Sequence, residues 1–385
     1  MHDMISCPRL PVFGWSAYSG ARDAHLPGVL SAPFRRYTVS GRAAISLALN
    51  VLQLKPGDEA LVPTYHCPTM ISPVAHAGLQ PLFYPITESG APDLNWIAQA
   101  DLKGVRVMLA THYFGLPQPM SAVRQFCDAH GIKLIEDCAH AFFGVSENRP
   151  VGSWGDIAIA SLTKFFPVPE GGLIVSTMHP LDDLSLTSRT WHDEIKAAAD
   201  AIEIGVRHGR FPGVNAALGG VFRLKDWVRG HDTSATIGAN GDSQDENPAL
   251  KRLLYSVRPT RVVRWITDSV HRSRIVALRR SNYMELARRF SDMRGGHVLR
   301  PVLPENAAPY VFPLYVNDPV ASYQPLRASG VPIFRWDEIW PGTPALEGDH
   351  GVEWSTHVFQ LGCHQDLSLD DLGTIATTVR GIVRP

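Results

Sequence analysis

The amino-acid sequence predicts a three-layer α/β protein, in which helices cover both faces of a mostly parallel sheet. From about residue 38 onward, patterns typical of helices alternate with short apolar runs typical of strands. Such alternation favours parallel strands that are joined by crossover helices. The chain has 385 residues, which is too long for one small core. We therefore expect a large domain with a smaller α+β domain attached.

Glycine and proline residues mark the ends of the predicted helices and strands of the large domain. Gly78 and Gly131 each stand just past a predicted helix, and Pro63 ends a short predicted strand. The expected helices cover residues 41–54, 67–77 and 120–130, and the expected strands end at Pro63 or lie within 80–86, 105–115, 132–141, 156–162 and 172–176.

The second half of the chain is less regular. Residues 180–210 are polar and helical in pattern, and residues 229–250 are rich in Gly, Asn, Asp and Ser, as in a loop or insertion. A basic helical region covers 261–290, where the arginines are expected to form a solvated face. Short strands follow from about residue 295, and the spacing of Ser368 and Asp371 predicts the start of a final helix. The domains predicted from these patterns are 1–228 (large), 229–262 (polar loop) and 263–385 (small).

The composition excludes several classes of function. Lys and Arg number 36 against 37 Asp and Glu, so no overall positive charge is available for nucleic acid or an anionic membrane. The five cysteines are scattered without the spacing of a metal site, which points to a reducing compartment. No apolar run approaches the roughly 20 residues of a membrane span, and the N-terminus lacks a signal-peptide pattern. We expect a cytoplasmic protein with no metal site.

One lysine stands inside an apolar stretch, "ASLTKFFPVPEGGLIVS", and suggests chemistry. Lys164 follows a predicted strand and precedes two phenylalanines. Loss of hydration lowers the pKa of a lysine, and a neutral amine attacks aldehydes and ketones. The alternative is a lysine that extends its ammonium group to the surface. Asp137 ends the run "IKLIED", where a carboxylate would face the crevice above the sheet, or would instead cap a helix; Glu136 should point the other way and be structural.

Two further stretches could hold a bound group. "SGRAAISLAL" opens a helix, and the free N–H groups of a first turn bind phosphate; Ser40, Gly41, Arg42 and Ala43 would form the cradle. Ser161, three residues before the lysine, would add a hydroxyl. In "PTYHCPT", Tyr65 or His66 would offer a flat ring to stack on a cofactor, or would be a core aromatic and a loop histidine.

Taken in order, these motifs resemble the DegT/StrS-type aminotransferases, which use pyridoxal phosphate and have fold type I. The resemblance rests on residues 38–180, where "SGRAAISLAL", "KPGDEALVP", "IKLIEDCAHA" and "LTKFFPVPEGGLIVS" follow the family order, and on "FQLGCHQDLSLDDL" near the C-terminus. It implies a seven-stranded, mostly parallel sheet, the cofactor pyridoxal 5'-phosphate and a homodimer. The sequence departs from the family pattern at Arg42, where threonine is usual, and at Cys67, which aligns with the usual stacking aromatic. No Gly-x-Asn-x-Arg-Met segment is found, and residues 206–262 occupy its place.

Carried over by position, the resemblance implies a role for each motif residue. Lys164 would form the internal aldimine and move the substrate proton, Asp137 would hold the pyridinium nitrogen, and His140 would lie beside the cofactor ring or its 3-oxygen. Gly41, Arg42 and Ser161 would lie near the phosphate. Arg335, in "PIFRWDEIW", is expected to bind a donor carboxylate or a substrate phosphate.

The function expected from this resemblance is transfer of an amino group from glutamate or glutamine to a keto acceptor, either a nucleotide-linked keto sugar or a natural-product intermediate. Two alternatives stay open at this point. One is a pyridoxal-phosphate-dependent lyase, dehydratase or condensing enzyme on the same fold. The other is a catalytically silent homologue with a regulatory role. The identity of donor and acceptor, and the residue that stacks on the cofactor ring, are not determined by the sequence.

Overall fold

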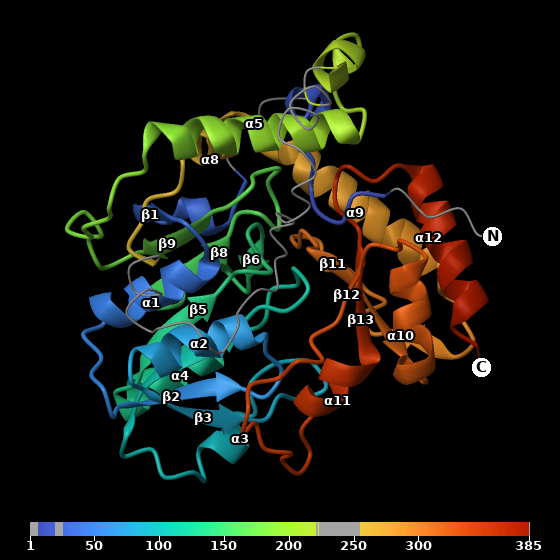
Figure 1. Ribbon diagram of the computed structural model, residues 1–385. Coiled ribbons are helices and arrows are strands. Elements are labelled where there is room, and N and C mark those ends of the chain that lie inside the picture. Colours follow the sequence, from blue (N-terminus) through green and yellow to red (C-terminus); the bar gives the residue numbers. More distant parts are fainter. Residues whose placement is uncertain (1–6, 20–25, 221, 223–254, 385) are drawn as a thin grey trace.

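A computed structural model describes residues 7–19, 26–220, 222 and 255–384 of the chain (Figure 1). The main sheet has seven strands in the order β1-β9-β8-β5-β4-β2-β3. The strands are β1 (Phe34–Thr38), β2 (Glu59–Pro63), β3 (Gln80–Tyr84), β4 (Val105–Thr111), β5 (Lys133–Asp137), β8 (Ile157–Ser161) and β9 (Gly172–Ser176). Five neighbouring strands run parallel, and only β9 is antiparallel to its partners β8 and β1. The predicted fold class is confirmed.

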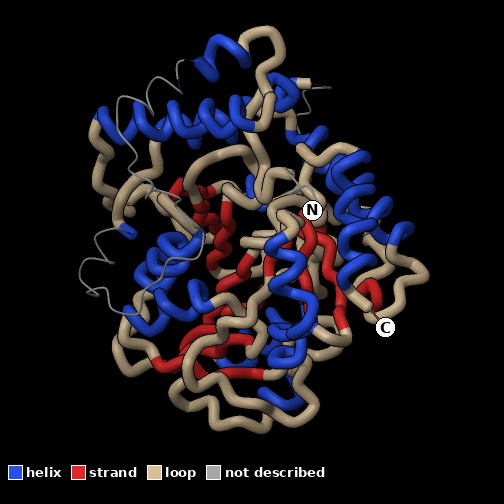
Figure 2. Tube along the Cα trace, turned by 45° about the vertical axis from the view of Figure 1, so that its right-hand side comes forward, coloured by secondary structure: helices blue, strands red, loops and turns tan. Residues whose placement is uncertain are grey.

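Helices cover both faces of this sheet, because alternate strand residues point to opposite sides. One face packs on α1 (Gly41–Val51) and α2 (Pro68–His76). The other face packs on α4 (Ser121–His130), α5 (Trp191–Arg207) and α8 (Arg261–Ser269). Figure 2 shows the strands inside and the helices around them. Smaller elements are the 3-10 turns Trp15–Tyr18 and Val29–Ser31, α3 (Leu94–Ile97), and the hairpin of β6 (Val145–Ser146) and β7 (Arg149–Pro150).

The C-terminal part forms a second sheet with its own core. Its four antiparallel strands have the order β10-β11-β13-β12. They are β10 (Gly296–Val298), β11 (Val311–Val316), β12 (Ile333–Phe334) and β13 (Val358–Gly362), accompanied by α10 (Pro319–Ala328), α11 (Gly351–His357) and α12 (Leu369–Ile382). Ser368 and Asp371 form the predicted capping box at the start of α12.

The helix α9 (Arg272–Arg289) connects the two cores. Ile275 at its start lies in the core of the large sheet, whereas Tyr283 and Leu286 lie in the core of the small one. Cys7, near the N-terminus, also packs in the small core. The expected domain limits at 228 and 262 stay predictions, since most of the expected polar loop (229–250) lies outside the described residues. Within the described ranges, every helix is too short or too polar to serve as a membrane span.

The basic helical region differs from the expectation in two ways. It forms two helices, α8 and α9, which are interrupted at Val270 and His271. Its arginines do not all form a solvated face, because Arg279 is completely buried. The expectation failed there because the burial of α9 between two sheets is set by tertiary packing rather than by local sequence.

The buried Arg279 guanidinium bonds to three separate segments of the chain. Its Nε donates to Gln365 Oε1 (2.8 Å), and its Nη2 donates to the backbone oxygen of Lys164 (2.7 Å). Its Nη1 donates to the backbone oxygens of Pro309 and Tyr310, both at 3.0 Å. Burial lowers the pKa of Arg279 to about 10, which still leaves it charged at neutral pH. Arg279 therefore fixes the lysine segment against the small sheet.

Replacing Arg279 with methionine is expected to lower the free energy of unfolding by about 3–5 kcal/mol, because it leaves several buried acceptors without a donor. Arg288→Met, on the exposed side of the same helix, is the matched control and should change stability by no more than about 0.5 kcal/mol. Denaturant unfolding followed by circular dichroism measures both. Equal effects of the two substitutions would contradict the role given to Arg279.

Candidate active site

Three predicted site residues meet at the carboxyl edge of the main sheet. Asp137 is the last residue of β5, and Ser161 is the last residue of the neighbouring strand β8, with Lys164 three residues further on. The helix α1 begins beside them, since a Cβ placed on Gly41 would lie 3.7 Å from the Cβ of Ser161. In parallel α/β sheets this edge is where ligands bind. The strand order thus gathers residues that lie far apart in the sequence.

Lys164 is the only lysine of this group, and its ammonium lies among protein atoms. Its Nζ is 5.3 Å from the ring centroid of Tyr310, and its backbone oxygen accepts from Arg279. Burial lowers the pKa of Lys164 below its ordinary value, and this effect outweighs the attraction of Asp137 and Cys67. The position of the amine therefore favours its neutral, nucleophilic form.

Asp137 is buried next to this amine. Its Oδ1 accepts from the backbone N–H of Ala139 at 2.8 Å. Burial raises the pKa of Asp137, whereas the Ala139 N–H and the charge of Lys164 act in the opposite direction. Among the described residues, no hydrogen bond is made to its second oxygen, Oδ2. This oxygen can therefore accept a hydrogen bond from a bound ligand.

His140 completes the group with a neutral imidazole. Its ring lies 4.6 Å from that of Tyr310 and 4.7 Å from that of Trp336, centroid to centroid. Burial, together with the charge of Lys164, holds the pKa of His140 well below its ordinary value. Its Nδ1 is buried and has no hydrogen-bond partner among the described residues. This nitrogen is therefore available to a ligand that binds beside the ring.

Fewer residues than predicted are available to bind a phosphate at the start of α1. Ser40 Oγ accepts from the N–H of Ala43 at 3.2 Å, so these two groups satisfy each other as the cap of α1. Ala43 itself is buried in the core. Gly41, Arg42 and Ser161 therefore remain as the residues placed to contact an anion at this helix start. Arg42 is half-buried and has contacts of its own.

The aromatic and histidine of "PTYHCPT" are engaged elsewhere. The His66 ring packs on Phe83, its Nδ1 bonds the Pro63 oxygen (2.9 Å), and its Nε2 accepts from the Trp340 N–H (2.9 Å). Burial lowers the pKa of His66 to about 4, and the ring has no nitrogen left for a cofactor. The stacking role expected for His66 therefore has no support in these contacts. Tyr65 is fully buried, accepts from Gln360 at its hydroxyl and packs on Trp336, so its stacking role has no support in these contacts.

The side chains of Arg335 and its neighbour Trp336 contact different parts of the molecule. The guanidinium of Arg335 stacks on Tyr323 at 4.0 Å and pairs with Asp337, which places it in the small sheet. The expected substrate contact of Arg335 is therefore not supported. Trp336 instead lies against His140, where it faces the site. The sequence analysis missed Trp336 and Tyr310, because single aromatics outside any motif give no local signal.

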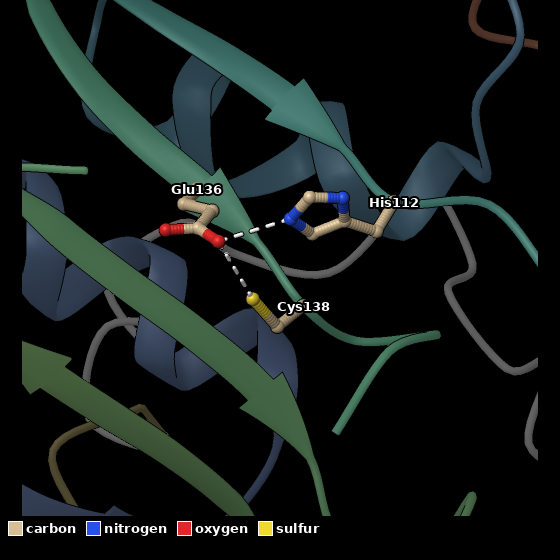
Figure 3. Close-up of side chains that lie close together, drawn as sticks. All are labelled: His112, Glu136 and Cys138. Atoms are coloured by element: carbon tan, nitrogen blue, oxygen red, sulfur yellow. Dashed lines mark hydrogen bonds and ion pairs between the residues drawn. The ribbon is translucent and has the colours of Figure 1, made fainter. Parts of the chain in front are cut away.

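A second buried group, His112, Glu136 and Cys138, lies close by and resembles a set of metal ligands (Figure 3). His112 Nδ1 accepts from the Gln118 N–H at 2.8 Å, so the proton is on Nε2, which donates to Glu136 at 2.9 Å. A protonated nitrogen has no lone pair for a metal ion. The group is therefore a hydrogen-bonded brace rather than a metal site.

The Glu136 carboxylate serves as the acceptor for a loop. The backbone N–H groups of Gly152, Trp154 and Gly155 donate to it at 2.7, 2.8 and 3.1 Å. Burial alone would raise the pKa of Glu136, but His112 and these N–H groups hold it below the ordinary value. As predicted, Glu136 points away from Asp137's side of β5 and is structural.

Comparisons with known proteins agree with this arrangement. Residues 35–196 match the family model of the DegT/DnrJ/EryC1/StrS aminotransferase family. This match confirms the resemblance found in the sequence, and the matched segment carries Lys164, Asp137, His140 and the start of α1.

Curated relatives share this part of the chain. GDP-perosamine synthase from Vibrio cholerae is 31% identical over 169 residues, which is 40% of this chain and 46% of the relative. A UDP-N-acetyl-3-dehydro-alpha-D-glucosamine 3-aminotransferase from Acidithiobacillus ferrooxidans is 27% identical over 55% of this chain and 61% of the relative. The matches thus span about half the length of these proteins.

Solved structures extend the likeness of fold to nearly the whole chain. The aminotransferase PseC of Helicobacter pylori, involved in the biosynthesis of pseudoaminic acid, has a TM-score of 0.61 at 14% identity, covering 92% of this chain and 87% of PseC. The GDP-4-keto-6-deoxy-D-mannose-3-dehydratase of E. coli, with bound hydrated PLP, has a TM-score of 0.60 at 18% identity, covering 91% and 88%. At these identities the likeness concerns the fold alone.

The charge of Asp137 is expected to raise the pKa of Lys164 relative to a variant that lacks it. In Asp137→Asn, the pKa of Lys164 should fall further, because the neutral amide no longer stabilises the ammonium. Competitive acetylation across a pH series, read by mass spectrometry of the Lys164 peptide, measures this pKa. Asp370→Asn, which removes an exposed carboxylate, is the control and should leave the midpoint unchanged. A midpoint that stays constant in Asp137→Asn would show that the two groups do not interact.

Glu136→Gln is expected to destabilise the fold by about 2–4 kcal/mol, because the amide nitrogen would face backbone N–H groups that need an acceptor. Thermal and urea unfolding measure this loss, and Glu347→Gln, at an exposed position, serves as the control. If both variants unfold like the parent, Glu136 is not the brace described above.

Proposed function

We propose that the protein is a pyridoxal-phosphate-dependent aminotransferase that transfers the amino group of glutamate or glutamine to a keto acceptor. The observation that carries the proposal is the placement of Lys164 and the buried Asp137 at the carboxyl edge of the sheet, close enough for each charge to affect the pKa of the other. The names of the relatives favour a nucleotide-linked keto sugar as the acceptor. A natural-product intermediate is the second acceptor class, since the matching segment covers less than half of the chain.

The residues at this edge fit pyridoxal phosphate. The cofactor has an aldehyde, a ring nitrogen and a phosphate, and the site offers an amine at Lys164, a carboxylate at Asp137 and a helix start beside Ser161. The free Oδ2 of Asp137 and the unpartnered Nδ1 of His140 are the polar atoms that such a ligand would satisfy. When bound, pyridoxal phosphate supplies an aldehyde that condenses with amines and a ring that accepts electrons.

Each residue then has a definite task. Lys164 Nζ, whose pKa is lowered by burial, would hold the cofactor through its aldehyde and would move the proton at the α-carbon of the amino donor. Asp137 would hold the ring nitrogen, where its carboxylate would favour the protonated, charged form of the ring. His140, kept neutral by burial, would lie beside the ring. Tyr310 and Trp336 restrict water around the amine.

A dehydratase on the same fold is the second candidate function, favoured by the structural likeness to the GDP-4-keto-6-deoxy-D-mannose-3-dehydratase. The two reactions differ in their products. Transamination releases the keto acid of the donor and adds its amino group to the acceptor. Dehydration removes water from the sugar, and the sugar product carries no amino group from the donor.

We further propose a homodimer. Several large apolar side chains are each more than half exposed, namely Trp191 and Ile195 on α5, Trp265 on α8 and Trp15 in the first 3-10 turn. Apolar surface of this kind is typical of protein interfaces. Sedimentation equilibrium at micromolar concentration should give twice the mass of the chain, and a monomer would refute the dimer.

The purified protein, supplied with pyridoxal phosphate, is expected to absorb at about 400–430 nm, the range of the cofactor joined to a lysine. Lys164→Ala should abolish this band, whereas Lys55→Ala, at an exposed lysine, should retain it. Glutamate or glutamine should bleach the band, and glutamate should yield 2-oxoglutarate, measured by a coupled dehydrogenase assay. If no amino acid bleaches the band, the aminotransferase proposal fails, and water loss from a keto sugar would support the dehydratase.

A further inference from the structure

Six arginines line one cavity of about 380 Å³ at the outer edge of the main sheet. The cavity lies between the edge strand β1, the start of α5 and the start of α8. Lys164, Asp137 and His140 are not among its lining residues. The arginines are Arg35, Arg36, Arg189, Arg258, Arg261 and Arg264.

The positive charge of this cavity is only partly balanced by the described residues. Glu170 pairs with Arg189 at 2.7 Å, and Asp268 pairs with Arg264 at 3.5 Å. Glu194 is the one acidic residue among those that line the cavity. Within the described part of the chain, the guanidinium groups of Arg258 and Arg261 have neither a hydrogen bond nor an ion pair, so positive charge is in excess.

Arg35 and Arg36 add to this excess. Their guanidinium groups donate to the backbone oxygens of Leu30 and Leu184, which carry no compensating charge. Like charges that are held together repel, and the repulsion is stronger beside protein than in open water. An arrangement of this kind is stabilised when an anion binds between the guanidinium groups.

Neutral groups of the cavity also favour an anion. Thr260, which caps α8, is almost completely buried, and its Oγ1 has no hydrogen-bond partner among the described residues. The next N–H, that of Arg261, donates to the carboxylate of Glu194 at 2.7 Å, so a negative group already occupies part of this helix start. A helix N-terminus and an unpaired hydroxyl both act as donors to an anion.

We propose that this cavity binds a multiply charged phosphate anion, specifically the diphosphate group of a small molecule. Guanidinium groups bind phosphate oxygens in pairs, and several of them converge here on one space. The volume is in the range of small-molecule sites and is too small for a nucleic acid strand. The inference is independent of the proposed aminotransferase activity, because none of the residues around Lys164 takes part.

The test is isothermal titration of the full chain, loaded with pyridoxal phosphate, with inorganic pyrophosphate. We expect saturable binding that weakens as salt is added, as for a site that neutralises phosphate charge. The double variant Arg258→Gln, Arg261→Gln should bind at least tenfold more weakly. Both side chains are exposed, and neither guanidinium group makes a hydrogen bond or ion pair with another described residue, so these changes should leave the fold intact.

Two further variants make the result decisive. Glu194→Gln should bind pyrophosphate several-fold more tightly, because it removes a negative charge and keeps an acceptor for the Arg261 N–H. Arg294→Gln, which removes an exposed arginine far from the cavity lining, should bind like the parent. Absence of pyrophosphate binding, an equal loss in Arg294→Gln, or equally tight binding of acetate would overturn the proposal.

Discussion

The position of the site depends on one buried cation. Arg279 reaches from the helix that connects the two cores to the backbone of Lys164, to the backbone beside Tyr310 and to Gln365. Gln365 in turn donates to the backbone oxygen of Phe165, the residue after the lysine. The loop that follows β8 is thereby held from the side of the small sheet. A buried guanidinium must have its donors satisfied, and Arg279 meets this need only when the lysine segment and the small sheet are both in place.

Burial explains the electrostatics of the site as well. Lys164 and Asp137 each lose hydration, which shifts their pKa values toward one another, and their mutual attraction limits both shifts. His140 is kept neutral by the same burial and by the neighbouring ammonium. An amine that is nucleophilic, a carboxylate that can hold a positive ring nitrogen and a neutral imidazole therefore coexist within a small volume. These are the conditions under which a lysine and a pyridine aldehyde react at neutral pH.

Only part of the chain matches the aminotransferase family model. The family match ends at residue 196, before α8, α9 and the small sheet. Beyond that point lie Tyr310 and Trp336, which surround the site, and three of the six arginines of the cavity at the sheet edge, Arg258, Arg261 and Arg264. The segment that matches the family model thus carries Lys164, Asp137 and His140, whereas Tyr310 and Trp336 lie outside it.

Local sequence by itself predicted the order of strands and helices and the fold class, and it singled out Lys164 and Asp137, whereas His140 came only from the resemblance to a family. These depend on period, on punctuation by glycine and proline, and on short motifs, all of which are properties of neighbouring residues. Only the tertiary structure decided which side chains are used up by packing. His66 bonds two backbone groups, Ser40 caps α1 and Arg335 stacks on Tyr323, although each looked available in the sequence. The tertiary structure also revealed Arg279, Tyr310 and Trp336, because contacts between residues more than a hundred positions apart leave no pattern in local sequence.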